Sequence, residues 1–143
     1  MPMKLRGLLL SLLVTCGVAH AGPFDSLAAR WAGDLKMSAT NRSSTGVDNI
    51  FKGPTYGQID TLGRLRFSLD NGCQISGNVT PASSSGKFDL IAKVTYCKVQ
   101  QSNDVYTGTI SPDGKKIIMT ATAARMVVVG SDSLSFTTIL AKY

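Results

Sequence analysis

The sequence contains no glutamate, and its single histidine, His20, lies near the amino terminus. Beyond residue 21 the chain therefore cannot build a Ser-His-Asp triad, a Cys-His pair, a histidine-ligated zinc site or a glutamate acid/base. All nine acidic residues are aspartates, and they stand singly near turns and strand ends. Aspartate in such places commonly bonds its own backbone. We expect a protein that is not an enzyme and that uses no cofactor and no metal.

The first 21 residues have the three parts of a secretory signal peptide. Lys4 and Arg6 form a basic start, residues 7–15 are mostly apolar, and Ala19-His20-Ala21 is an Ala-x-Ala ending. The apolar stretch is too short to cross a hydrocarbon core about 30 Å thick, so we predict no transmembrane span. We predict cleavage after Ala21 and export to the periplasm or the medium of a bacterium.

An alternative to soluble export is a lipoprotein. Leu13-Val14-Thr15-Cys16 resembles a bacterial lipobox, in which Cys16 would carry the lipid. In the soluble form, by contrast, cleavage after Ala21 leaves 122 residues, which suit a single domain, and lowers the formal net charge from +6 to +4. We divide the chain into the leader at 1–21, an N-terminal arm at 22–30 and one β domain at 31–143.

Two of the three cysteines, Cys73 and Cys97, remain after this cleavage. An even pair in a small exported domain predicts one disulfide, and the alternative is two buried thiols. Closing this loop should stabilise the fold by about 3–4 kcal/mol in the chain-entropy model. The pair lacks the Cys-x-x-Cys spacing of redox-active sites, so we do not expect thiol exchange.

From residue 31 onward the hydrophobic period is two rather than 3.6, which is typical of half-buried strands. In the segment 64–70, large apolar residues alternate with Arg64, Arg66 and Ser68. Asn71-Gly72 follows and predicts a type I′ hairpin turn. Polar composition predicts long loops at 41–54 and 81–86. We expect either a bulge near Thr95–Tyr96 or a disulfide on the outer face, because the apolar alternation changes register there.

The predicted strands recur at intervals of roughly 8–12 residues, with hairpin-length turns between nearly all of them. They cover 31–40, 56–60, 64–70, 73–79, 87–99, 105–110, 115–123, 125–129 and 134–143. This pattern predicts an all-β fold, a small antiparallel meander that forms an up-and-down, calycin-like β-barrel of about eight strands. A β-sandwich is the alternative.

Arg64, Arg66 and Trp31 make up the candidate binding surface. The two arginines share a solvent face and suit an anionic partner such as an envelope polysaccharide, a lipid headgroup or an acidic protein. The alternative is a solvated face whose charges prevent aggregation. Trp31 is either a ligand platform or a plug at the base of the barrel. We predict no nucleic-acid binding, because the chain lacks a dense basic stripe with aromatic stacking platforms.

These observations favour an exported, non-enzymatic binding module that recognises a protein or polymer of the envelope or the extracellular space. An inhibitor or immunity-type protein would be one form of it. A small-molecule carrier that uses the barrel interior is a first alternative, suggested by small inward residues such as Gly33, Ala39, Gly77 and Ala92. A structural or surface-assembly subunit is a second. The sequence makes no prediction of the oligomeric state.

Overall fold

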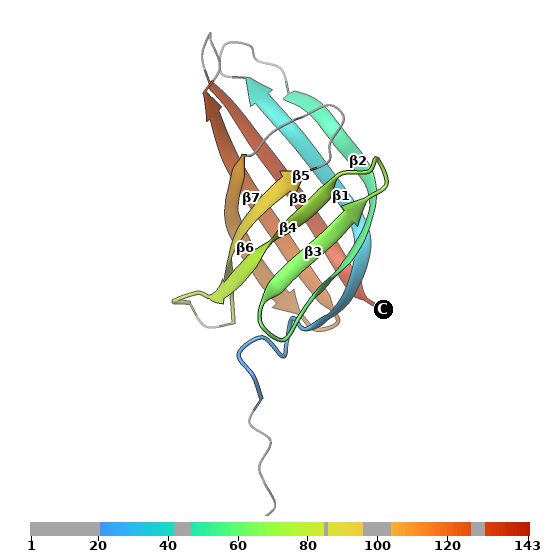
Figure 1. Cartoon of the computed structure of the whole chain (residues 1–143), viewed down its shortest axis with the longest axis vertical. Helices are drawn as coiled ribbons and strands as arrows, with labels where there is room; N and C mark the ends of the chain where they lie inside the picture. The colour runs from blue at the N-terminus through green and yellow to red at the C-terminus, as the bar shows by residue number, and fades with distance from the viewer. Residues whose placement is uncertain (1–20, 42–46, 85, 96–103, 127–130) are drawn as a thin grey trace, which may run out of the picture.

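The computed structural model describes residues 21–41, 47–84, 86–95, 104–126 and 131–143. Within these ranges the chain forms eight β-strands and no helix. They are β1 (Ala29–Asn41), β2 (Val47–Ile59), β3 (Arg64–Leu69), β4 (Gln74–Pro81), β5 (Phe88–Thr95), β6 (Val105–Asp113), β7 (Lys116–Met126) and β8 (Ser131–Lys142). Each strand pairs antiparallel with the next, and β8 pairs with β1, so the sheet closes into a barrel (Figure 1). The predicted up-and-down barrel is confirmed, and the sandwich alternative is not formed.

Alternation along the strands fills the interior of the barrel. In β5, for example, Phe88, Leu90, Ala92 and Val94 are buried, and the residues between them are exposed. Tyr106 and Phe136 meet in the centre, with their ring centroids 5.2 Å apart. Each large apolar side chain that leaves water in this way stabilises the fold by about 1.5–3 kcal/mol. The other largest fully buried side chains are Trp31, Phe67, Leu27, Leu35, Met37, Ile75, Leu90, Ile110, Ile117 and Met119.

The segment before β1 closes one end of the barrel. The backbone N–H groups of Leu27 and Ala28 both donate to the carbonyl oxygen of Phe24, which makes a single tight turn. This turn inserts Leu27 into the core, where it is fully buried, and sets the Phe24 ring 6.1 Å from that of Phe88. The arm that precedes β1 in Figure 1 is therefore packed against the barrel from Phe24 onward.

The prediction of a long loop at 41–54 is wrong from Val47 onward, because β2 begins at Val47 and pairs with β1. The polar composition and Pro54 concealed this strand. The carbonyl oxygen of Pro54 accepts the N–H of Asp70. The backbone nitrogen of Pro54, which carries no hydrogen, therefore points to the same side, toward β3. Since β3 ends at Leu69, opposite Thr55, no β3 residue pairs with Pro54. A proline is tolerated in a strand where its N–H is not needed.

The hairpin between β3 and β4 also differs from its prediction. Leu69 donates its N–H to the carbonyl oxygen of Cys73 at 2.9 Å, and Gly72 donates to that of Leu69 at 3.0 Å. The loop therefore has three residues, 70–72, and is not the predicted two-residue type I′ turn. Gly72 at φ +89° supplies the left-handed residue that such a loop needs at its third position. The Asn71 side chain holds the turn by accepting the N–H of Cys73 at 3.0 Å.

Two predictions concern segments near the ends of strands. Of the separate strand predicted at 125–129, Arg125 and Met126 belong instead to β7, in which Met126 pairs with Ser131 of β8, and residues 127–129 lie outside the described ranges. The bulge expected at Thr95–Tyr96 cannot be followed, since residues 96–103 lie outside the described ranges. β8 begins at Ser131, three residues before the predicted start.

Candidate binding surface

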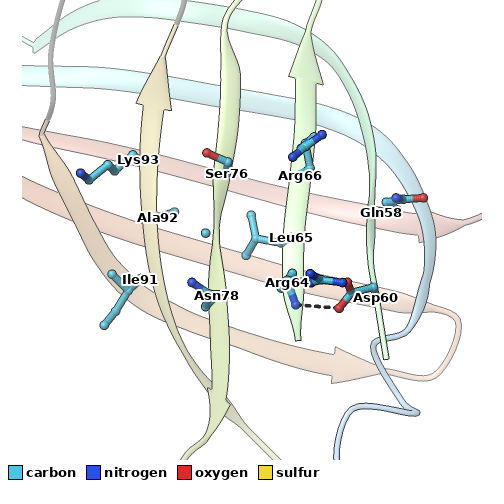
Figure 2. A pocket seen from close by; sticks show the side chains of 11 residues that line it. Gln58, Asp60, Arg64, Leu65, Arg66, Ser76, Asn78, Ile91, Ala92 and Lys93 are labelled. Atoms are coloured by element: carbon cyan, nitrogen blue, oxygen red, sulfur yellow. Dashed lines mark hydrogen bonds and ion pairs between the residues drawn. The ribbon is translucent and has the colours of Figure 1, made fainter. Parts of the chain in front are cut away.

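An open hollow of about 580 Å³ lies on the outer wall of the barrel over β2 to β5 (Figure 2). Outward-facing polar residues and the exposed Ile91 line it together with Gly77 and the buried Leu65 and Ala92. The lining residues are Gln58, Asp60, Arg64, Leu65, Arg66, Ser76, Gly77, Asn78, Ile91, Ala92 and Lys93. The described lining therefore combines hydrogen-bonding side chains, three cations and one carboxylate with apolar groups, of which Ile91 is exposed.

Arg64 and Asp60 form an ion pair at one end of the hollow. The Arg64 Nε donates to Asp60 Oδ2 at 2.7 Å. Asp60 Oδ1 accepts the backbone N–H groups of Leu62 and Arg64, each at 2.9 Å. The hydrogen bond from the Arg64 backbone is the largest cause that lowers the pKa of the Asp60 carboxyl, and the guanidinium lowers it further. Asp60 therefore remains ionised and offsets the charge of Arg64.

The other two cations of the hollow are Arg66 and Lys93. Both are exposed, and Ser76 lies between them, because Arg66 pairs with Ser76 in β4 and Ser76 pairs with Lys93 in β5. Asp60 is the one acidic residue among the described residues that line the hollow, and it is already paired with Arg64. Arg66 and Lys93 thus leave the hollow with a net charge of two positive units.

The same register extends this arrangement beyond the hollow. Arg30 of β1 pairs with Gln58 of β2, and Gln58 pairs with Arg66 of β3. Arg30, Gln58, Arg66, Ser76 and Lys93 are consecutive pair partners on five adjacent strands, and we name them the transverse row. Neighbouring strands lie about 4.8 Å apart, so the backbone positions of successive cations are about 10 Å apart along the wall.

Of the three residues predicted as a binding surface, the structure brings two together. Arg64 and Arg66 line the same hollow. Trp31 is only 1% exposed, and its indole N–H donates to the carbonyl oxygen of Leu27 at 2.8 Å. The prediction that Trp31 contributes exposed binding surface is therefore wrong, and its alternative, a plug in the barrel, is what the structure has.

Sequence reasoning missed Arg30, Gln58, Ser76 and Lys93. Gln58, Ser76 and Lys93 lie in segments that were predicted as strands, so their exposure could have been predicted, whereas Arg30 was assigned to the N-terminal arm and belongs to β1. The alignment of the four residues could not be predicted, because it depends on the register between strands. A slip of one residue in that register would move a side chain to the other face of the sheet.

The structure describes one of the two cysteines that are predicted to form a disulfide. Cys73 is buried at 3% exposure, while Cys97 lies outside the described residues. Gln74 of β4, which follows Cys73, lies opposite Thr95 of β5, which is two positions before Cys97. The disulfide stays a prediction.

Within the described ranges, no group of three or more histidine, cysteine or acidic side chains comes close enough together to hold a metal ion. No helix there has the length and apolar character that a membrane span requires.

Comparison with known proteins gave no relative. No protein-family model, curated protein or solved structure matches this chain.

Proposed function

We propose that this protein is an exported, non-enzymatic binding module that holds an anionic envelope or extracellular macromolecule on the hollow over β2 to β5. The observation that carries the proposal is the position of Arg66 and Lys93 on either side of Ser76, in a hollow whose one carboxylate is already paired. Two exposed cations over an uncharged hydroxyl attract an anion and donate hydrogen bonds to it.

The packing of the interior favours the outer wall over the carrier alternative. Gly33 and Gly77 suggested space inside the barrel. A Cβ on Gly33 would instead overlap the carbonyl oxygen of Ile139, and one on Gly77 would overlap that of Ile91. These glycines mark places where two strands approach closely. The close approach of the strands therefore gives the missing side chains at Gly33 and Gly77 an explanation other than internal space.

Export is part of the proposal, and the start of the folded region is compatible with it. The backbone nitrogen of Gly22 donates to Asp25 Oδ2 at 2.7 Å. Cleavage after Ala21 would turn this nitrogen into an ammonium group beside the carboxylate, and a charge-assisted hydrogen bond is stronger than a neutral one. The predicted disulfide between Cys73 and Cys97 belongs to the same proposal.

The strength of the interaction follows from the openness of the hollow. Charges that stay in contact with water interact weakly, so each cation should add modestly to the affinity and salt should screen the interaction. A long anionic polymer, which can engage several copies or several cations at once, compensates by increasing the effective concentration of its charges.

Equilibrium binding to immobilised polygalacturonate and poly-L-glutamate, measured between low and physiological salt, tests the proposal. We expect the wild type to bind at least one polymer with an affinity that falls as salt rises. The double variant Arg66→Glu/Lys93→Glu should lose at least about tenfold in affinity, because two attractions become repulsions.

The matched control is Lys36→Glu/Lys52→Glu, since these two exposed lysines pair across β1 and β2 away from the hollow. This control has the same net charge as the double variant. Equal losses of affinity in the two variants would show that only the net charge of the protein matters. If the wild type binds neither polymer, the proposal of an anionic partner is wrong.

A further inference from the structure

The transverse row alternates in chemistry as it crosses the barrel wall. Arg30, Arg66 and Lys93 stand on β1, β3 and β5, and Gln58 and Ser76 stand between them on β2 and β4. A cation thus recurs on every second strand, and the position between two cations carries an uncharged group that donates and accepts hydrogen bonds. The row spans four strand intervals, or about 19 Å along the wall.

Both kinds of side chain in the row are available to a ligand. Arg30, Gln58, Arg66 and Lys93 are exposed and Ser76 is half-buried. The guanidinium and ammonium groups reach outward from the curved wall, whereas the shorter amide and hydroxyl stay closer to it. A ligand laid along the row would meet charge and neutral hydrogen-bonding groups in turn.

The alternation distinguishes between classes of anionic polymer. A polymer with a charge on every unit would place carboxylates over Gln58 and Ser76, which can hydrogen-bond to them but cannot neutralise them. A polymer with alternating anionic and neutral, hydroxyl-bearing units would place each carboxylate near a cation and each hydroxyl near an amide or a hydroxyl.

The composition of the row also favours a hydrated polymer over a protein partner. The centre of a protein interface is usually rich in aromatic and apolar side chains, with the polar groups at its rim. The row has the opposite order. From Arg30 to Lys93 it has no apolar member, and the exposed apolar side chains lie beside it: Val105 follows Lys93 at its end, and Ile91 is two residues before Lys93 on β5.

We infer that the transverse row binds an acidic polysaccharide whose charged and neutral sugars alternate. This inference rests on the proposed function, which it narrows to a ligand class, and it adds Arg30, which lies outside the hollow, to the binding surface. The row would bind the polymer across the strands, with Gln58 and Ser76 reading the neutral sugars.

The first test compares two oligosaccharides of the same number of sugars. Hyaluronan oligosaccharides alternate a uronate with a neutral N-acetyl sugar, whereas oligogalacturonate carries a carboxylate on every sugar. Although it has half the charges, the hyaluronan oligosaccharide should bind the whole protein at least as tightly in isothermal titration calorimetry. Its affinity should rise with oligomer length and level off once the oligomer spans the row.

The second test uses variants that separate the row from the hollow. Arg30→Gln and Arg66→Gln should each weaken the binding of hyaluronan by about threefold to tenfold, because each removes one charge-assisted contact. Lys36→Gln, on β1 like Arg30 but outside the row, should leave the affinity within about twofold.

The outcomes separate this inference from the proposed function. If oligogalacturonate or poly-L-glutamate binds more tightly than hyaluronan in proportion to its charge, or if Arg30→Gln behaves like Lys36→Gln, the alternating glycan is wrong while an anionic partner stands. If none of the anionic probes binds, the proposed function fails as well.

Matched isoleucines test the protein alternative. Ile91 and Ile139 are 58% and 59% exposed on different parts of the wall. For a hydrated glycan, Ile91→Ser should change the affinity for hyaluronan no more than Ile139→Ser does. A selective loss in Ile91→Ser would show an apolar contact beside the row and would contradict the inference.

Discussion

At the scale of single residues, Asp60 sets the charge of the hollow. Its Oδ1 holds the β2–β3 turn by accepting the N–H groups of Leu62 and Arg64, and its Oδ2 accepts the Nε–H of Arg64, whose charge the carboxylate neutralises. One carboxylate therefore serves a structural role and lowers the positive charge available to a ligand. These two roles can be separated, because an amide oxygen accepts the same backbone hydrogen bonds without carrying the charge.

We predict that Asp60→Asn raises the affinity for polygalacturonate by about twofold to fivefold at low salt, because it leaves Arg64 without its counter-charge. The gain should shrink as salt rises, since the added attraction is screened. Titration calorimetry at two salt concentrations measures both effects. Asp70→Asn, in the neighbouring hairpin loop and outside the hollow, controls for the change in net charge. A weaker or unchanged affinity in Asp60→Asn would show that Arg64 takes no part in binding.

The same carboxyl gives the stability a defined pH dependence. Its pKa in the folded protein lies below the ordinary value of 3.8, so folding favours its ionised form. The resulting stabilisation is fully present above pH 3.8 and is lost as the pH falls through the lowered pKa of the folded state. Asp60→Asn should therefore remove part of the acid sensitivity that the wild type shows below pH 3.8 in thermal unfolding.

At the scale of strands, the barrel needs positions without a side chain. Gly77 of β4 faces inward, and β5 approaches so closely that a Cβ at this position would overlap the Ile91 carbonyl oxygen and lie 2.7 Å from the Ala92 Cα. Both neighbours are backbone atoms, which cannot move without shifting the strand. Glycine in a strand often marks such a close approach, and bends of this kind help to close a sheet.

Gly77→Ala should consequently lower the free energy of unfolding by about 1–3 kcal/mol, the usual cost of overpacking. Ser76→Ala, one residue earlier and on the outer face, should change it by less than about 0.5 kcal/mol. Urea unfolding of the three proteins gives the comparison. If Gly77→Ala is as stable as the wild type, the contact between β4 and β5 relaxes more readily than the structure indicates.

Strands also show how far sequence reasoning reaches. Period-two alternation identified β3, β4 and β5 and the faces of Arg64 and Arg66, because burial on one side imposes that pattern. It missed most of β2, from Val47 through Pro54, whose proline and polar residues are typical of a loop. Pairing with the 13-residue β1 overrides that local preference, and such pairing is a tertiary effect that composition does not record.

At the scale of the whole molecule, closure connects the fold to the candidate surface. Because each of the eight strands in the described part of the chain pairs on both sides, none of them is an open edge strand, and outward residues from distant parts of the chain are held in register. Arg30 and Lys93 are far apart in sequence, yet the ladder from β1 to β5 places them in one row. The alternation in that row could not be predicted from sequence, because it requires four registers to be known at once.

The predicted disulfide would act on the whole molecule as well, because it would join the ends of two paired strands. Cys73 adjoins Gln74 of β4, which pairs with Thr95 of β5, and Cys97 is two positions beyond Thr95. We expect Cys97→Ser to lower the free energy of unfolding by about 3–4 kcal/mol without reductant and by little in its presence. Cys73→Ser should cost more in both conditions, since it also places a hydroxyl at a buried position.

The mass of the protein purified from its own cell envelope under non-reducing conditions provides the direct check. Residues 22–143 minus two hydrogens would agree with both the cleavage and the disulfide. The same mass without that loss, together with equal stability of Cys97→Ser and wild type in the absence of reductant, would leave the barrel to be stabilised by its core alone. A bound small molecule that stays with the native protein would instead favour the carrier alternative. In that case binding would have to be sought inside the barrel, where the described side chains are closely packed.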